Sequence, residues 1–225
     1  MPVNKEAYIS IKAVLDAKKV TLVAVSKTKP VEDILELYEL GHRDFGENYV
    51  QELVEKAAQL PPDIRWHFIG HLQTNKVKLI APFVQLIHGV DSLKLLEAIN
   101  KEATKQERVM DCLLQVHIAE EETKFGLDEK ELDLIISQFE NLKMTGARVC
   151  GLMGMASFTN DMDPVKKEFH HLKELFDKHA QPQTSNFELK ILSMGMSSDY
   201  KVALEEGSTM VRIGSLLFGE RGAGA

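Results

Sequence analysis

The feature that most constrains the fold is a regular alternation between short apolar runs and longer segments with helical spacing. Strands that alternate with single helices form right-handed βαβ units and a parallel sheet. The apolar residues of the longer segments recur at intervals of three and four, as on the buried face of an amphipathic helix. The short runs rich in apolar and β-branched residues are Leu22–Val25, Asp44–Gly46, Trp66–Ile69, Val84–His88, Cys112–Ile118, Ala147–Leu152, Leu189–Leu192 and Thr209–Ile213.

About eight such units in a chain of 225 residues predict an α/β fold, a single (β/α)8 barrel of the TIM type. A helix over about Lys5–Ala17 precedes the first strand and adds to the barrel. The alternative is an open Rossmann-like sheet, but no G-x-G-x-x-G follows the first strand, which counts against it. No linker divides the chain, so we expect residues 1–225 to form one domain.

Capping signals predict where several helices begin. Asp128 with Glu131 is typical of a capping box, and Asp163-Pro164 of an N-cap followed by a first-turn proline. Two further helices are expected after the last two strands, over about Ser198–Glu206 and over Ser215–Phe218.

Composition excludes several classes of partner. The net charge of -7 argues against nucleic acid or an anionic membrane as the main partner. No apolar run approaches the roughly 20 residues needed to span a bilayer, and the N-terminus lacks a secretory signal. The chain has only 2 cysteines, expected as reduced thiols. Together these observations predict a cytoplasmic protein.

The fold predicts where a ligand binds before any particular residue is considered. In a (β/α) barrel the binding site lies at the C-terminal ends of the strands. Here those ends carry a polar, glycine-rich ring of residues above an apolar barrel. The segments of this ring are Val25–Lys27, Phe45–Asn48, Phe68–His71, Gly151–Met155, Ser193–Ser198 and Arg212–Ser215.

Lys27 is the most informative residue of this ring. It shares strand parity with Val23 and Val25, so its ammonium stands at the barrel mouth if those two valines point inward. A lysine held there is partly desolvated, which favours the neutral amine that attacks an aldehyde. A lysine that only tops a strand and reaches solvent is the alternative from position alone. Lys29, beside Pro30, is the competing amine and is expected to be more exposed.

The loops after the last two strands predict an anion site. Ser197 and Ser198 precede one helix, and Gly214 and Ser215 begin another, so backbone N–H groups and hydroxyls lie together. Barrels that bind phosphate often do so after strands seven and eight. Serine and glycine are also ordinary caps and turns, which leaves a structural role open.

Arg212 shares parity with Met210, which places it inward beneath this site. A buried arginine could instead pair with a structural carboxylate.

His67 and His71 lie four apart in a strand and its loop, which disfavours a zinc site, and no metal is expected. No paired acids, nucleophile elbow or P-loop assigns a catalytic residue.

Several blocks along the chain resemble the pyridoxal phosphate homeostasis protein family, whose barrel is similar to the N-terminal domain of alanine racemase. The resemblance runs from about residue 20 to Gly219. The blocks that carry it are LVAVSKTKP from Leu22, FGENYVQE from Phe45, WHFIGHLQ from Trp66, GLMGM from Gly151, SMGMSSD from Ser193 and VRIGS from Val211.

The resemblance implies a site for pyridoxal 5′-phosphate. It implies a Schiff base between Lys27 and the cofactor aldehyde, and Arg212 facing the pyridine nitrogen. It also implies phosphate held by the loops of Ser197, Gly214 and Ser215. Asn48 and His71 would be wall residues.

The function implied is intracellular storage, buffering and delivery of this vitamin B6 cofactor, with no turnover. Apoenzymes that require the cofactor are the partners implied, and a monomer is expected. The alternative is an amino-acid racemase or decarboxylase that depends on the cofactor. A racemase needs a base on each face of the substrate, and we expect the barrel to account for the chain, with no second domain to supply one. A Schiff-base aldolase is disfavoured because its lysine would lie on a middle strand.

Overall fold

The eight apolar runs form eight parallel strands, and each pairs with its neighbours along the chain until β8 closes on β1. A computed structural model describes residues 3–121, 125–181 and 184–219. The closed α/β barrel predicted from the alternation is therefore confirmed. The strands are β1 Thr21–Val25, β2 Asp44–Glu47, β3 Arg65–Phe68, β4 Leu86–Val90, β5 Met110–Gln115, β6 Ala147–Met153, β7 Phe187–Ser193 and β8 Met210–Ile213.

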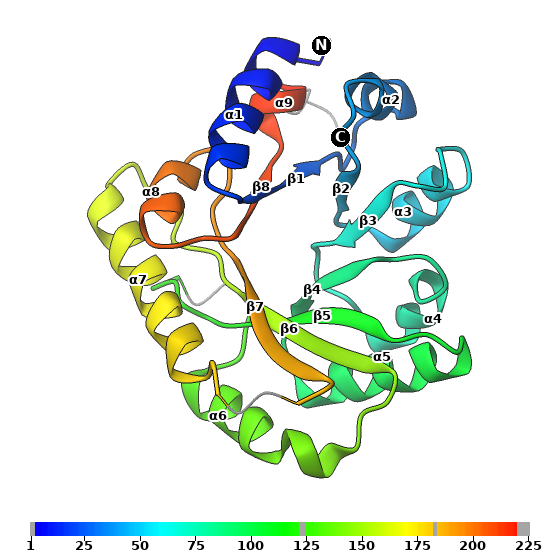
Figure 1. The fold of residues 1–225 in the computed structure, drawn as a ribbon, viewed down its shortest axis with the longest axis vertical. Coiled ribbons are helices and arrows are strands. Elements are labelled where there is room, and N and C mark those ends of the chain that lie inside the picture. Colours follow the sequence, from blue (N-terminus) through cyan, green and yellow to red (C-terminus); the bar gives the residue numbers. More distant parts are fainter. Residues whose placement is uncertain (1–2, 122–124, 182–183, 220–225) are drawn as a thin grey trace.

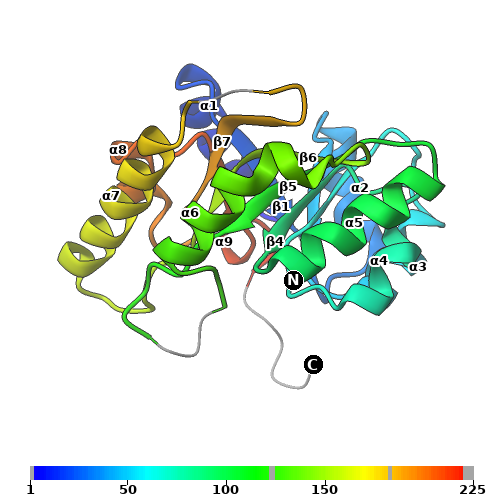
Figure 2. The same ribbon diagram turned by 90° about the horizontal axis from the view of Figure 1, so that it is seen from below.

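The helices form an outer layer around these strands (Figure 1). Figure 2 shows α3, α4 and α5 on one side of the strands and α6 and α7 on the other. Apolar side chains of the helices and of the outward strand faces form the main core. The α-helices are α1 Lys5–Ala17, α2 Val31–Glu39, α3 Val50–Ala57, α4 Val77–Ile80, α5 Leu93–Lys105, α6 Glu129–Gln138, α7 Met162–Lys178, α8 Tyr200–Glu205 and α9 Ser215–Phe218. Short 3-10 helices span Thr74–Lys76 and Phe139–Leu142.

The predicted extra helix is α1, and it packs beside α9 near the end of the described chain. Asn4 caps α1 by accepting from the N–H of Ala7, and its own N–H donates to the carbonyl of Leu217 at 2.8 Å. The start of α1 is thus hydrogen-bonded to α9, and this contact helps to hold α9 in place after β8.

Most strand ends differ from the predicted runs by one to three residues, and two of these differences are informative. β4 begins at Leu86, two residues after Val84, and β5 ends at Gln115, three residues before Ile118. Val84 and Ile118 are buried next to the strands but lie outside them. An apolar run indicates that its residues are buried. Residues can stay buried in a loop after the hydrogen bonds between neighbouring strands have ended.

Helix starts were predicted with mixed success. The capping box of Asp128 and Glu131 at the start of α6 is confirmed. The predicted N-cap Asp163 is wrong, because α7 begins at Met162 and Asp161 caps it. Pro164 is tolerated at the third helical position, since the first four N–H groups of a helix have no partner within it.

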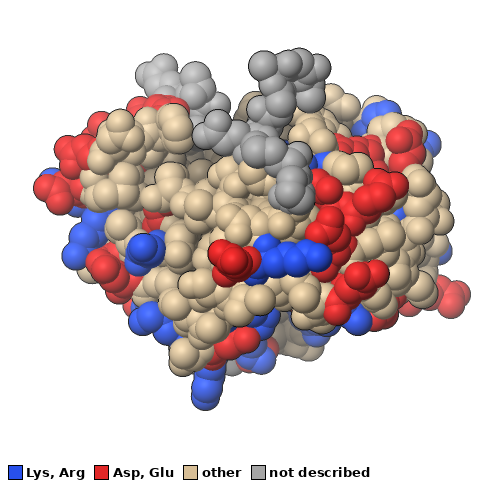
Figure 3. Space-filling view, turned by 90° about the horizontal axis from the view of Figure 1, so that it is seen from above, with Lys and Arg blue, Asp and Glu red and all other residues tan. Residues whose placement is uncertain are grey.

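The surface mixes charges of both signs. On the face drawn in Figure 3, basic and acidic side chains are interspersed among the other described residues.

Among the described residues, every helix is too short or too polar to span a lipid bilayer. Cys112 and Cys150 are both free thiols, as predicted.

Candidate functional site

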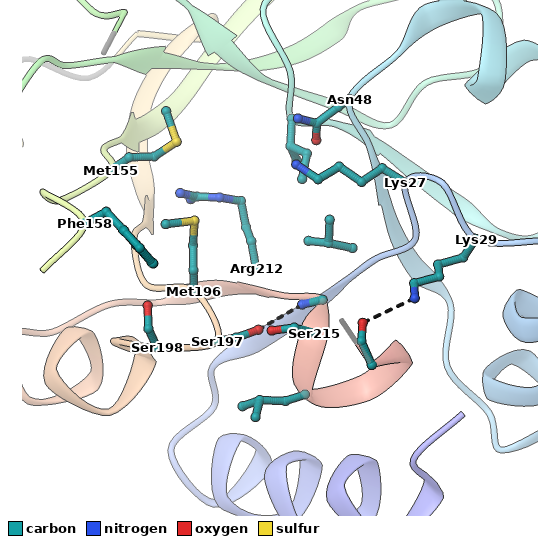
Figure 4. A pocket seen from close by; sticks show the side chains of 15 residues that line it. Lys27, Lys29, Asn48, Met155, Phe158, Met196, Ser197, Ser198, Arg212 and Ser215 are labelled. Atoms are coloured by element: carbon teal, nitrogen blue, oxygen red, sulfur yellow. Dashed lines mark hydrogen bonds between the residues drawn. The ribbon is translucent and has the colours of Figure 1, made fainter. Parts of the chain in front are cut away.

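A cavity of about 580 Å³ lies at the C-terminal ends of β1, β2, β3, β6, β7 and β8. This volume falls within the roughly 300–1,000 Å³ of small-molecule sites. Six of the seven residues predicted for the cofactor line it, together with apolar side chains (Figure 4). The lining residues are Val25, Lys27, Lys29, Asn48, Ile69, Met155, Phe158, Met196, Ser197, Ser198, Arg212, Gly214, Ser215, Leu216 and Gly219.

Lys27 follows the end of β1 and extends its half-buried side chain into this cavity (Figure 4). Its parity partner Val23 is fully buried among the inward side chains of the barrel, as predicted. The next residue, Thr28, has φ 63°, a left-handed conformation that is costly for a β-branched residue. Its N–H donates to Oε1 of Glu52 at 2.6 Å. This charged hydrogen bond holds the turn that directs Lys27 into the cavity.

The same turn is anchored by Lys56 of α3, which is buried. Its ammonium donates to the carbonyl of Ser26 at 2.7 Å, to Oε1 of Glu47 at 2.8 Å and to Oε1 of Glu52 at 2.7 Å. These bonds use all the hydrogens of an ammonium group. The hydroxyl of Ser26 also donates to Glu47, at 2.6 Å. Burial raises the pKa of Glu47, and the charge and hydrogen bond of Lys56 oppose that rise.

Lys29 also lines the cavity and is half-buried like Lys27, so its greater exposure stays a prediction. Its ammonium donates to the carbonyl of Phe218 at 2.7 Å and to that of Gly219 at 3.2 Å (Figure 4). Lys29 thus ties the loop after β1 to the end of α9.

Asn48 lies beside Lys27 in the cavity wall (Figure 4). Its side-chain oxygen is buried and has no hydrogen-bond partner in the described part of the chain. A buried polar atom without a partner costs roughly 1–3 kcal/mol, and a polar ligand could remove that cost. The arrangement fits a ligand with a polar atom at this point.

His71 is the predicted wall residue that the structure does not bring to the cavity. Its Nδ1 lies 3.0 Å from Oδ2 of Asp91, and its ring stacks on Phe125 at 4.5 Å between centroids. The chain bends at Gly70, where only glycine fits because a Cβ would come within 2.2 Å of the Asn48 carbonyl, and His71 lies beyond this bend. Ile69 is the last residue of this segment that lines the cavity.

The loops after β7 and β8 form the side of the cavity opposite Asn48 (Figure 4). The hydroxyl of Ser197 accepts from the N–H of Gly214 at 3.3 Å. Gly195 has φ 97°, which favours glycine, and Asp199 accepts from the N–H of Met196 at 2.6 Å. This turn delays α8 to Tyr200, so Ser198 lies in the loop rather than in the predicted helix. The hydroxyls and N–H groups here suit an anion.

Arg212 lies inward on β8, as its parity predicted, and is 4% exposed. Its Nη1 donates to the carbonyl and hydroxyl oxygens of Ser193 at 2.9 and 2.6 Å, and its Nη2 donates to the carbonyl of Gly154 at 3.2 Å. Burial lowers the pKa of Arg212 to about 10, and the charge of Asp199 opposes the fall. Among the described residues its hydrogen-bond partners are carbonyls and a hydroxyl, and no carboxylate lies in ion-pair contact with it.

The rest of the wall is apolar. Met155, Met196 and Phe158 lie together on the side of Arg212 (Figure 4), and Phe158 is 82% exposed. Met153 and Met194 are buried in the core instead. In the ranges that the structure covers, no cluster of His, Cys, Asp and Glu could hold a metal ion.

Sequence reasoning missed Glu52 and Lys56, which hold the site from behind, and it placed Glu47 and Ser193 in the ring without their supporting role. Lys56 lies four residues after Glu52 on α3, which reads as an ordinary surface ion pair. Only its burial reveals the contact with the loop of Lys27. A lysine that interrupts the apolar face of a helix was the available signal.

Comparison with known proteins gives consistent results. Residues 6–222 match the family described as alanine racemase, N-terminal domain. A pyridoxal phosphate homeostasis protein of Aquifex aeolicus is 43% identical over 89% of this chain and 86% of that protein. One from Homo sapiens is 42% identical over 92% of this chain and 78% of that protein. The structure of PipY from Synechococcus elongatus with PLP bound is similar, with a TM-score of 0.84, 34% identity, and coverage of 95% of this chain and 99% of that one.

Proposed function

The chain belongs to the pyridoxal phosphate homeostasis protein family, and from this premise we propose that it binds pyridoxal 5′-phosphate at the strand ends and keeps it available to other proteins. The observation that carries the proposal is one cavity that combines the amine of Lys27, the amide oxygen of Asn48 and the loops of Ser197 and Gly214. That oxygen is buried and has no partner among the described residues. A relative with the same barrel binds this cofactor.

Each part of the cavity would hold a different part of the ligand. When bound, pyridoxal phosphate supplies an aldehyde, which condenses with an amine and releases water to form a Schiff base. Lys27 would supply that amine. Ser197, Ser215 and the N–H of Gly214 would hold the phosphate, whose oxygens replace the bond between Ser197 and Gly214.

Arg212 would face the ring nitrogen of the cofactor. Three of its five N–H donors are used within the described residues, which leaves Nε–H and one hydrogen on Nη2 for a ligand. A guanidinium donates a hydrogen bond but keeps its proton at any relevant pH. Arg212 would therefore leave the ring nitrogen unprotonated, which weakens the ring as an electron sink and suits storage better than transamination.

We further propose that the protein is a carrier and not a turnover enzyme. The ionisable side chains among the described lining residues are Lys27, Lys29 and Arg212. Racemisation needs a base on each face of the substrate. Lys29 is held by two carbonyls at the end of α9, and no carboxylate, histidine or tyrosine of the described lining stands opposite Lys27. Cofactor-requiring apoenzymes as recipients, a cytoplasmic location and a monomeric state belong to the same proposal.

Cofactor attachment is tested with purified protein and pyridoxal phosphate. We expect a visible absorption band that borohydride removes, leaving one pyridoxyl mass on the peptide that contains Lys27. Lys27→Ala should abolish the adduct. The matched variant Lys29→Ala, from the same loop and the same cavity, should keep it. An adduct on Lys29, or none in the wild type, would contradict the assignment.

The carrier proposal has its own test. Loaded protein is incubated with a panel of L- and D-amino acids, and racemisation, decarboxylation and keto-acid release are followed. We expect no turnover above slow side reactions. A kcat near the roughly 10 s⁻¹ typical of enzymes would establish the racemase or decarboxylase alternative. Activation of an apoenzyme by loaded protein, faster than release of free cofactor allows, would support delivery.

A further inference from the structure

A continuous chain of hydrogen bonds crosses the interior of the barrel and ends on Arg212. Oδ1 of Asp44 lies 3.1 Å from Nε2 of His67, and Nδ1 of His67 lies 3.0 Å from Nε2 of His88. Nδ1 of His88 lies 3.2 Å from Oγ of Ser193, which accepts from Nη1 of Arg212 at 2.6 Å. The chain therefore joins β2, β3, β4, β7 and β8 across the barrel.

Beyond Asp44, whose side chain is 16% exposed, this hydrogen-bond chain is buried. His88 and Ser193 are 0% exposed, and His67 is 3% exposed. Apolar side chains that include Val23, Leu86 and Met210 fill the barrel around it. Hydrogen bonds in such low-dielectric surroundings are stronger than in water, and an unpaired polar atom there is costly. Each member therefore needs both of its partners.

The two ends of the chain fix the direction of every hydrogen bond in it. An arginine has no acceptor, so Ser193 must accept from Arg212. The other partner of its hydroxyl in the described part of the chain is Nδ1 of His88, which takes the serine hydrogen. At the other end Asp44 accepts. Burial opposes its ionisation, but hydrogen bonds from Arg65 and His67 hold the pKa of Asp44 well below its usual range. Both imidazoles are then neutral, each with its hydrogen on Nε2.

We propose that Ser193, His88, His67 and Asp44 are positioning residues, which hold the guanidinium of Arg212 in the orientation that meets the cofactor ring. This inference rests on the proposed function, because it assigns these residues to the same site from the opposite side of the barrel. The hydrogen-bond chain acts by geometry: because His88 takes the serine hydrogen, the lone pairs of Ser193 stay directed at Arg212.

The opposite arrangement of hydrogens is excluded by the same contacts. A second proton on His67 would point Nδ1–H at Nε2–H of His88, across a separation of 3.0 Å. His88 would then carry its hydrogen on Nδ1 and donate it to Ser193, whose two lone pairs can accept from both His88 and Arg212. The hydrogen of the Ser193 hydroxyl would then have no acceptor among the described residues, at a position with no access to water. Burial, and next the charges of His67 and Arg212, lower the pKa of His88 well below its ordinary value, in agreement with a neutral ring.

The direction of the chain is tested first in the ligand-free protein. Nitrogen-15 NMR of labelled histidine distinguishes protonated from unprotonated ring nitrogens. We expect both His67 and His88 to carry hydrogen on Nε2 alone at neutral pH. Hydrogen on Nδ1 of His88, or a doubly protonated His67, would overturn the proposal. This measurement needs no cofactor, so it decides the inference even if pyridoxal phosphate does not bind.

Variants then test whether the chain positions Arg212. Ser193→Ala should speed exchange of the Arg212 side-chain N–H groups in the ligand-free protein and weaken pyridoxal phosphate binding by roughly 5- to 10-fold, the effect of one lost hydrogen bond. Ser208→Ala is the matched control, because Ser208 is a buried serine whose hydroxyl contacts, within the described residues, only the carbonyls of Leu192, Met194 and Met210. Equal effects of the two variants on exchange and on binding would overturn the proposal.

His88 provides a test with a conservative rescue. His88→Leu removes both hydrogen bonds, whereas His88→Gln keeps a side chain with one acceptor and one donor. We expect His88→Leu to loosen Arg212 and to shift the absorption band of the bound cofactor, and His88→Gln to restore part of both. If both variants behave alike, the volume of His88 matters rather than its hydrogen bonds, and the proposal fails. If the wild type binds no cofactor but the NMR result is as expected, the proposed function is refuted and the direction of the hydrogen-bond chain still stands.

Discussion

The buried ion pair behind Lys27 gives the sharpest prediction for stability. In the variant Lys56→Met, the carboxylate of Glu47 loses the only ammonium that contacts it within the described residues. The two side chains are 7% and 0% exposed, so water cannot replace the lost partner. Removing one member of a buried pair costs roughly 3–5 kcal/mol. At roughly 2–4 °C per kcal/mol for a chain of this length, Tm should fall by about 6–20 °C.

The assay is urea unfolding followed by circular dichroism, with thermal unfolding as a second measure. Lys178→Met is the control, because Lys178 pairs with Asp133 at the surface, where the side chains are 51% and 47% exposed. That variant should cost at most about 1 kcal/mol. The double variant Lys56→Met with Glu47→Gln should recover most of the lost stability, since no buried charge is left unpaired. It should not recover cofactor binding, because the carbonyl of Ser26 still lacks its partner.

The pH dependence separates this account from simple loss of packing. The pKa of Glu47 is already raised by burial, and removal of Lys56 raises it further. A carboxyl group with a raised pKa in the folded state destabilises the protein at neutral pH, and the penalty shrinks as pH falls and the group takes up a proton. The deficit of Lys56→Met should therefore decrease from pH 7.5 to 5. A loss below 1 kcal/mol, or a double variant no more stable than the single one, would refute the reasoning.

Three further predictions concern other parts of the barrel. Arg212→Ala should weaken pyridoxal phosphate binding by roughly 1–3 kcal/mol in a titration followed by absorbance, and undiminished affinity would contradict its proposed place at the ring. Gly195→Ala should lower the free energy of unfolding by roughly 1–3 kcal/mol, because φ is 97° and the new Cβ would come 2.6 Å from that of Ala203. Gly41→Ala, at φ 91° with nothing within 4 Å, should cost less, and equal losses would show that the clash is irrelevant. Burial lowers the pKa of His42 from 6.5 to about 4, so stability is full above pH 6.5 and is lost as pH falls toward 4, by roughly 3 kcal/mol relative to His42→Gln. Parallel pH profiles of the wild type and this variant would show that His42 is not responsible.

Much of the site could be predicted from the sequence because strand parity is a local property. Val23 and Lys27, or Met210 and Arg212, differ by an even number of residues and so share a face of their strand. In a barrel of parallel strands every strand ends at the same rim, which brings Lys27, Asn48 and Ser197 together without further information. The alternation of apolar runs and amphipathic segments determined the barrel itself.

Only the tertiary structure decided which residues support that rim. His88 and Ser193 are separated by 105 positions and meet only because the closed barrel brings β4 and β7 to a common interior. His71 shows the converse: it follows the end of a strand, as a site residue should, yet Gly70 turns the chain and His71 pairs with Asp91 instead. Spacing along the chain determines which face of a strand carries a given side chain. Its partners depend on the register between distant strands and on the space left by their neighbours, which no local pattern contains.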